Sequence, residues 1–187
     1  ILNEFQPWYH GPAPQRILDL CCGGGCIGLA VAHYYPDVQV DLLDIDRAAL
    51  QLARENAEAL GLADRVNIIP SDVFAALSGQ RYDLILSNPP YVDVADMAAL
   101  PAEFHHEPKL ALGSGPDGLD ITRRILREAG RYLQDSGLLV VEVGNSWTAL
   151  EAAYPRVPFT WLEFEHGGDG VFALSAKELQ DYGASLI

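Results

Sequence analysis

Residues 88–91, Asn-Pro-Pro-Tyr, combine side chains and backbone groups that could hold a reacting nitrogen. The rings of Pro89 and Pro90 fix φ and remove two backbone N–H donors, so the carbonyls stay available as acceptors. The side-chain oxygen of Asn88 and the Pro89 carbonyl could accept both hydrogens of an amide or aromatic NH2 group, and Tyr91 adds a flat wall. We therefore predict a site that orients an NH2 nitrogen. The alternative is a proline turn that only ends a strand.

A glycine-rich stretch, "DLCCGGGCIG", is the second chemical feature of the sequence. From Gly23 it reads G-G-G-C-I-G, which matches the dinucleotide-binding pattern. Gly23, Gly24 and Gly25 allow the backbone to approach a ligand closely. Asp44 follows Gly25 by nineteen residues and could accept hydrogen bonds from both hydroxyls of a ribose. The two features together predict a nucleotide-like ligand, whereas the alternative for Asp44 is a solvated strand end.

Polar residues end four of the predicted strands, and parallel α/β sheets bind ligands at the carboxyl ends of their strands. These residues are Asp19, Asp44, Asp72 and Asn88. We expect them to converge on one crevice, with Asp72 placed to accept the exocyclic amine of an adenine. Asp72 could also serve as the N-cap of a helix over "VFAAL", a role that does not exclude binding.

The elements that must position these residues alternate along the chain. Short apolar runs predict buried parallel strands at 16–20, 38–45, 65–70, 82–88 and 138–144. Apolar residues at three- and four-residue spacing predict helices over 26–35, 47–60, 119–133 and 146–153. Gly61 and Gly137 fit helix C-terminal stops. The alternation predicts a doubly wound α/β sheet.

The C-terminal segment departs from this alternation. "FTWLEFEH" and "GVFALS" are two strand-like runs joined by "GGD", with no room for a helix, so they are predicted to pair as an antiparallel hairpin. A terminal hairpin added to a parallel sheet is typical of class I methyltransferases rather than of ordinary dinucleotide-binding folds. This feature therefore favours methyl transfer.

Composition limits the classes of partner. A net charge of −14 repels a phosphate backbone, so we expect no direct nucleic acid binding and favour a basic protein partner. Apolar runs are too short to span a bilayer, which predicts no membrane association and a cytoplasmic protein. Cys21, Cys22 and Cys26 occupy one loop, where we expect packing under a tight turn and a reducing compartment rather than a metal site.

At this point a family resemblance is clear. "DLCCGGGCIG", "LLDID", "SDVF" and "SNPPY", in this order, resemble the N5-glutamine methyltransferases that modify translation proteins. "LPAEFHHEPKLALGSGPDGLD", "EVGNS" and "YPRVPFTWLEFEHGGDGVFAL" are similar to the branch that methylates large-subunit ribosomal protein L-three, more than to the branch acting on peptide chain release factors.

The resemblance implies a role for each matched residue. The cofactor would be S-adenosylmethionine, yielding S-adenosylhomocysteine. Its methionine part would be wrapped by residues 21–25, its ribose held by Asp44, and its adenine flanked by Asp72 and Val73. Asn88, Pro89, Pro90 and Tyr91 would bind the glutamine side chain. Asp19 and Asn88 also belong to the expected cofactor site. Residues 1–187 would form the methyltransferase domain, without the helical N-terminal domain of the family, and the chain has no initiator methionine.

Other functions remain open from the sequence. A DNA adenine-N6 methyltransferase uses a similar motif but needs a basic face. A nicotinamide-dependent dehydrogenase explains the glycines and leaves residues 88–91 without a role, while a binding module does not explain the crevice. No general base is obvious near the motif. The long loop over 92–115 suggests a lid, in which His105, His106 and Glu107 are expected to be solvated.

Overall fold

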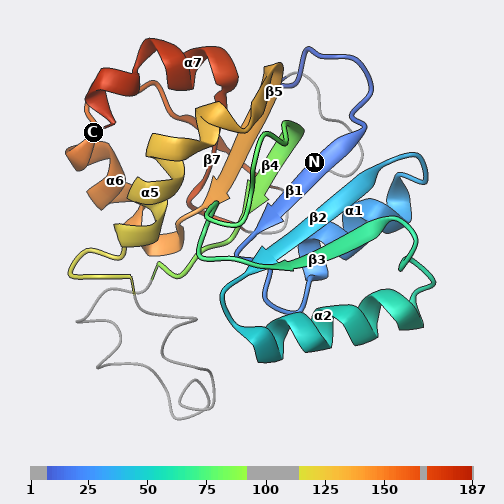
Figure 1. Cartoon of the computed structure of the whole chain (residues 1–187). Coiled ribbons are helices and arrows are strands. Elements are labelled where there is room, and N and C mark those ends of the chain that lie inside the picture. Colours follow the sequence, from blue (N-terminus) through green and yellow to red (C-terminus); the bar gives the residue numbers. More distant parts are fainter. Residues whose placement is uncertain (1–7, 92–113, 165–167, 187) are drawn as a thin grey trace.

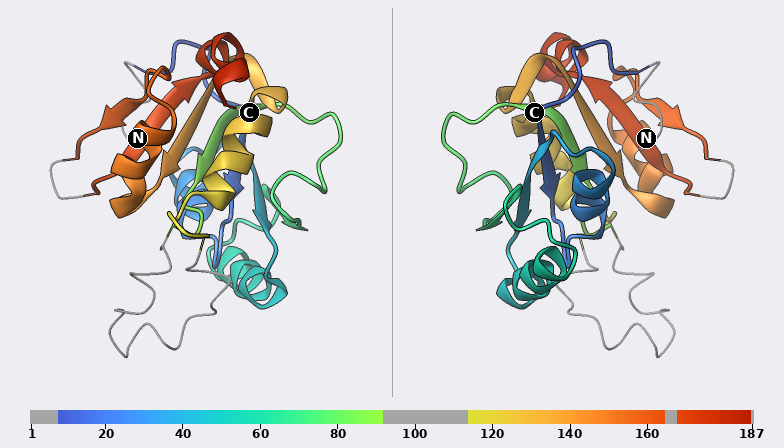
Figure 2. Two further views of the ribbon diagram at one scale, coloured as in Figure 1. Left: turned by 90° about the vertical axis from the view of Figure 1, so that its left-hand side faces the viewer. Right: turned by 90° about the vertical axis from the view of Figure 1, so that its right-hand side faces the viewer.

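The computed structural model describes residues 8–91, 114–164 and 168–186, and these form one seven-stranded sheet of order β3-β2-β1-β4-β5-β7-β6. Its strands are β1 Arg16–Leu20, β2 Gln39–Asp44, β3 Val66–Pro70, β4 Tyr82–Ser87, β5 Leu133–Glu142, β6 Thr160–Leu162 and β7 Val171–Ser175. β1 to β5 are parallel, and β7 is antiparallel to both β5 and β6. This confirms the predicted class I methyltransferase sheet with its antiparallel hairpin. Figure 2 shows β3 and β6 at opposite edges.

Helices cover both faces of the sheet (Figure 1). They are α1 Cys26–Tyr34, α2 Arg47–Ala59, α5 Asp120–Glu128, α6 Trp147–Ala153 and α7 Ala176–Asp181. One core layer joins Leu29 of α1 and Ala53 of α2 to the sheet. The opposite layer joins the sheet to α5, α6 and α7, which contribute Ile125, Leu150 and Leu179. The sheet is thus buried on both sides, as its continuous apolar strands predict.

Local sequence explains the bounds of α2. The Asp46 side chain caps the helix by accepting from the Ala48 N–H at 2.8 Å. Leu50, Ala53 and Ala57 recur at helical spacing and are the buried residues of this helix. Gly61 follows with φ of 67°, a left-handed conformation that favours glycine and ends the helix.

The helix predicted over 119–133 is shorter than expected. α5 ends at Glu128, a 3-10 turn covers Ala129–Arg131, and β5 begins at Leu133. β5 pairs with β4 from Leu133, which is level with Tyr82. The register then shifts, because Leu84 is level with Leu138 and the extra residues of β5 form an irregularity. Gly137 lies inside β5, where a Cβ would approach the Gln134 carbonyl oxygen to 2.9 Å. The glycine therefore serves a strand bulge, and its prediction as a helix stop is wrong.

The C-terminal helix α7 has no counterpart among the predicted elements. Ser175 and Glu178 form a capping box, in which the Glu178 N–H donates to the Ser175 hydroxyl and the Ser175 N–H to the Glu178 carboxylate. Residues 92–113 of the predicted lid, with His105, His106 and Glu107 among them, lie outside the described residues. Within the described part of the chain, every helix is too short or too polar to cross a membrane.

A buried polar cluster joins β3, β2, β1 and β4 near the amino ends of these strands. Asp41 of β2 is 1% exposed and accepts from three side chains. The donors are the Arg16 guanidinium at 2.8 Å, the Tyr82 hydroxyl at 2.7 Å and the Asn67 amide at 2.7 Å. The carboxylate is therefore buried with its acceptors satisfied, as a stable interior requires.

Candidate functional site

Strand register brings Asp44 and Asn88, two of the predicted polar residues, to one level of the sheet. Leu20 of β1 is level with Leu43 of β2 and with Ser87 of β4, and Val141 of β5 is level with Ser87. The residues one position further along are, in sheet order, Asp44, Cys21, Asn88 and Glu142. The carboxyl ends of four strands thus meet at one edge.

The alternation of side chains also assigns these residues to one face. Each of four polar residues follows by two positions an apolar residue of the core layer that contains α1 and α2, and side chains two apart share a face. The apolar residues are Ile17, Leu42, Leu86 and Val140, and the polar residues are Asp19, Asp44, Asn88 and Glu142. Three of the four were predicted as site residues.

The glycine loop is tied directly to Asp44. The Gly23 N–H donates to Asp44 Oδ2 at 2.8 Å, and the Asp46 N–H donates to Oδ1 at 2.8 Å. Asn56 of α2 donates to the Gly24 carbonyl at 3.0 Å. Each carboxylate oxygen has a second lone pair, so Asp44 can still accept from ligand hydroxyls while it holds the loop. A Cβ at Gly25 would lie 2.9 Å from Leu42 Cδ1. A Cβ at Gly23 would have no atom within 4 Å, so the space beside Gly23 is open.

Backbone strain marks the predicted cofactor residues. Among the described residues, the non-glycine residues with positive φ are Cys21 at 60° and Val73 at 50°. Such conformations are costly, most of all for a β-branched residue, and concentrate at functional sites. Ser71 stabilises the second one: its hydroxyl donates to the Val73 carbonyl at 2.7 Å and accepts from the Ala76 N–H at 3.0 Å.

The cysteines of the loop are free thiols in this structure. Burial raises the pKa of Cys21 to about 12, with a smaller contribution from Asp44. Burial likewise raises the pKa of Cys22. Both groups are therefore protonated at neutral pH, which suits packing rather than metal binding or nucleophilic attack. No cluster of three or more His, Cys, Asp or Glu with metal-site geometry occurs within residues 8–91, 114–164 and 168–186.

Asp19 is a buried carboxyl beside the first turn of α1. Its Oδ2 accepts from the Gly28 N–H at 2.8 Å, and Oδ1 has no partner among the described residues. Burial raises the pKa of Asp19 to about 7, offset in part by the Gly28 hydrogen bond. Gly28 is required at this contact, because a Cβ would lie 2.3 Å from Leu42 Cδ2. An unpartnered buried oxygen at this edge fits a ligand or water that donates to it.

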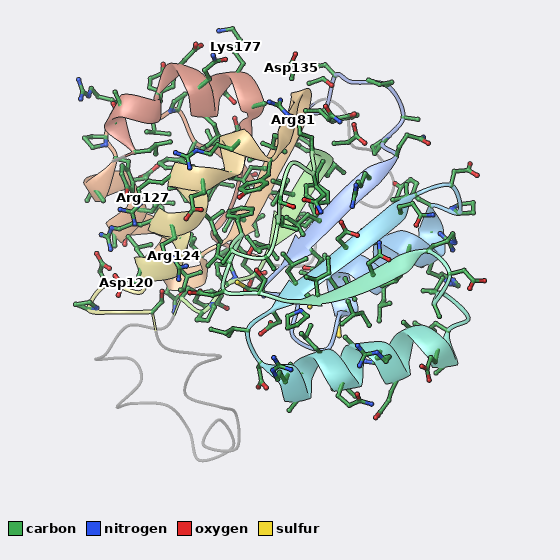
Figure 3. The ribbon with its side chains drawn as sticks, in the orientation of Figure 1. Arg81, Asp120, Arg124, Arg127, Asp135 and Lys177 are labelled. Atoms are coloured by element: carbon green, nitrogen blue, oxygen red, sulfur yellow. The ribbon has the colours of Figure 1, made fainter. Side chains whose placement is uncertain are left out.

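Asp72 has a partner that the sequence analysis did not consider. Its Oδ1 accepts from Arg124 Nη1 at 2.8 Å, and Arg124 projects from α5 (Figure 3). Both side chains are partly exposed, at 52% for Asp72 and 35% for Arg124, so solvent screens this pair. Residues 73–76 form turns, so the alternative of a helix capped by Asp72 is wrong.

Residues 88–91 leave β4 at the centre of this edge. The Ser87 hydroxyl donates to the Leu20 carbonyl at 2.7 Å and joins the ends of β4 and β1. Asn88 is exposed at the edge, Pro89 is buried, and Pro90 and Tyr91 are partly buried. The motif therefore has a fixed base and an accessible amide.

Tyr91 is held by the end of β5, by the segment that follows β5 and by the turn before α5. Its carbonyl accepts from the Ser146 hydroxyl at 2.9 Å, and a Cβ at Gly118 would lie 2.1 Å from the same oxygen. Its ring packs on Gly144, where a Cβ would lie 2.5 Å from Cε2. Its hydroxyl lies 3.5 Å from Glu142 Oε1. Burial, and secondarily Glu142, raise the pKa of Tyr91.

Glu142, Arg124 and Ser146 contact the predicted residues but were not themselves predicted from the sequence. Glu142 ends the strand "LLVVE", so the rule that selected Asp19 and Asp44 would have selected it as well. Arg124 carried no comparable signal, because its contact with Asp72 joins residues 52 positions apart.

Comparison with known proteins agrees with this geometry. Residues 5–115 match the family described as "Methyltransferase small domain". The chain is 50% identical over 183 residues to a ribosomal protein uL3 glutamine methyltransferase of Francisella tularensis, covering 97% of this chain and 58% of that protein. It is 51% identical over 179 residues to the protein of the same name from Neisseria gonorrhoeae, covering 95% and 59%. These matches confirm the predicted resemblance.

The chain spans less than two thirds of the length of these relatives. A methyltransferase structure from Pyrococcus furiosus shares the fold with a TM-score of 0.63 at 16% identity, covering 88% of this chain and 75% of that one. Sequence match, sheet order and the arrangement at the carboxyl edge lead to one conclusion: the chain belongs to the methyltransferase small domain family.

Proposed function

We propose that this chain is the catalytic domain of an S-adenosylmethionine-dependent enzyme that methylates N5 of a glutamine in ribosomal protein uL3, the L-three protein of the large subunit. The observation that carries the proposal is the position of residues 88–91, which follow the strand hydrogen-bonded beside the glycine loop. The names of the two relatives support the choice of substrate.

The residues at the edge fit the cofactor. Residues 21–25 form a loop with an unobstructed approach at Gly23, and Asp44 has acceptor capacity for ribose hydroxyls. The unpartnered oxygen of Asp19 lies beside the first turn of α1 and suits a donor such as an amine or an ordered water. Asp72 and Val73 would flank the adenine. When bound, S-adenosylmethionine supplies a sulfonium-activated methyl group; the protein contributes binding and orientation.

Residues 88–91 are proposed to orient the substrate amide. A carboxamide nitrogen is a weak nucleophile because its lone pair is delocalised into the carbonyl. Two acceptors, the Asn88 side-chain oxygen and the Pro89 carbonyl, would fix the NH2 group and favour charge that develops on nitrogen. Tyr91, fixed by Ser146 and Gly144, would provide the flat wall for the side chain.

Charge supports a basic protein as the partner. Twelve basic and 26 acidic residues give the chain a net charge of −14, which disfavours a DNA phosphate backbone and attracts a cationic protein. We therefore propose uL3 ahead of a nucleic acid substrate, and treat release factors and DNA adenine as competing outcomes of the experiment.

The function is tested in two stages. S-adenosylhomocysteine should bind and raise the melting temperature of the protein, because a ligand that binds only the folded state stabilises it. NAD should give no shift, and equal shifts with both would contradict the cofactor. Isotope-labelled methyl transfer is then measured for free uL3, release factor and adenine-containing DNA. We expect labelling of uL3 at a glutamine. Labelling of release factor alone or of DNA alone would show that the proposed substrate is wrong.

A further inference from the structure

We propose that Glu142 accepts the proton that the substrate nitrogen loses on methylation. This inference rests on the proposed function, because it concerns the amide held by residues 88–91. The juxtaposition of Glu142 with Asn88 and Tyr91 carries it.

Glu142 is held next to the motif by backbone pairing on both sides. Val141 is level with Ser87 of β4, so Glu142 and Asn88 are the next positions on neighbouring strands. On the other side, Glu142 pairs with Val171 of β7. Strand alternation puts Glu142 on the same face as Asn88, and the Tyr91 hydroxyl approaches its Oε1 to 3.5 Å. The carboxylate thus lies beside the residues proposed to hold the substrate amide.

The carboxylate of Glu142 retains capacity for a ligand. A separation of 3.5 Å is the long limit of a hydrogen bond, so Tyr91 occupies the carboxylate weakly. Within the described residues, none of the ion pairs involves Glu142. Tyr91 is the titratable neighbour on the β4 side, and the partner on β7 is the apolar Val171. A partly buried carboxylate with no cation partner among the described residues suits a site where positive charge develops.

The reaction balances with Glu142 as acceptor. The lone pair of the amide nitrogen forms a bond to the methyl carbon, and the carbon–sulfur bond breaks with its electron pair remaining on sulfur. The nitrogen then carries the positive charge that the sulfonium has lost. One N–H proton passes to the Glu142 carboxylate, which becomes a neutral acid and later releases the proton to solvent. The product is a neutral N-methyl amide, and no further reactant is required.

The experiment compares Glu142→Gln with two other variants in the full-length protein acting on uL3. Glutamine preserves size and an acceptor for the Tyr91 hydroxyl but cannot take a proton, so kcat should fall about 100-fold. The KM for uL3, the dissociation constant of S-adenosylhomocysteine and the melting temperature should stay unchanged.

The matched control is Glu58→Gln, which removes one carboxylate from the exposed side of α2 and should retain full activity. Tyr91→Phe separates a direct role from a positioning role, because it removes the hydroxyl and keeps the carboxylate. If Tyr91→Phe lowers kcat as much as Glu142→Gln does, Glu142 acts through Tyr91 and the proposal is wrong. Near-normal turnover by Glu142→Gln would also overturn it.

A binding measurement provides a readout other than activity. With S-adenosylhomocysteine present, a uL3 variant carrying ornithine at the target glutamine places a cation where charge develops. The unaltered enzyme should bind it about tenfold more tightly than Glu142→Gln does, since hydrogen bonds to charged groups contribute more than neutral ones. Equal binding would overturn the inference. An unaltered enzyme that is inactive on uL3 would refute the proposed function itself.

Discussion

Asp41 and Asp19 lie on neighbouring strands and are equally buried, each 1% exposed, yet their surroundings are opposite. Asp41 accepts from Arg16, Tyr82 and Asn67 near the amino ends of the strands. Asp19 accepts from the Gly28 N–H alone among the described residues, and burial raises its pKa to about 7. A buried carboxylate with satisfied acceptors contributes to the fold, whereas an incompletely satisfied one at the carboxyl edge supports the proposed cofactor site.

Asp41→Ala should produce the largest loss of stability. It leaves the Tyr82 hydroxyl and Arg16 without their acceptor, and removing one partner of a buried pair costs about 3 to 5 kcal/mol. The lower end applies because Arg16 is 41% exposed and can be solvated. Denaturant unfolding measures the effect, with the exposed Asp64→Ala as a control that should change little. Unaltered stability would show that the Asp41 cluster is dispensable.

Asn88→Ala should affect turnover and leave stability unchanged, because Asn88 is exposed. Without the side-chain acceptor the substrate NH2 rotates out of line, so kcat on uL3 should fall about 100-fold or more. Steady-state kinetics and calorimetry with S-adenosylhomocysteine separate the two effects. If cofactor binding disappears together with activity, Asn88 belongs to the cofactor site and not to an amide clamp.

Asp44→Ala should weaken S-adenosylhomocysteine binding by about 1 to 3 kcal/mol, the usual cost of stranding hydrogen-bonding groups. The variant removes the ribose acceptor and also the acceptor of the Gly23 N–H. Isothermal titration measures the change, and circular dichroism checks that the fold is intact. An unchanged dissociation constant would transfer the ribose role to Asp46, the next acid along the chain.

Asp19→Asn should give the smallest effect, a change in the pH dependence of stability. The pKa of Asp19 is about 7 in the folded protein and near 4 in the unfolded protein. Between about pH 4 and pH 7 the folded protein therefore binds more protons than the unfolded protein does. Its contribution to stability therefore falls as pH rises from about 4 through 7, by about 1 kcal/mol between pH 6 and pH 8. Relative to Asp19→Asn, the unaltered protein should lose this amount in parallel denaturant titrations. Parallel curves would show that Asp19 has an ordinary pKa.

The positions of most proposed site residues along the strands were predictable because they follow local rules. Apolar runs ending in a polar residue identified Asp19, Asp44 and Asn88, since parallel strands present their carboxyl ends to one edge. Two adjacent strand-like runs also predicted the antiparallel hairpin, which the structure confirms. The helix predicted over 119–133 was too long. Gly137 was predicted to stop that helix, but it lies in a strand bulge, and the sequence alone does not distinguish the two roles of glycine.

The sequence by itself determined the fold class, the glycine loop and the motif at residues 88–91. Each of them follows from patterns of residues that are close together along the chain. Tertiary structure decided the strand order, which puts β5 beside β4 and thereby Glu142 beside Asn88. It also decided that Arg124 pairs with Asp72 and that Tyr91 packs on Gly144. These contacts join residues more than fifty positions apart, so they depend on how the layers pack rather than on local pattern.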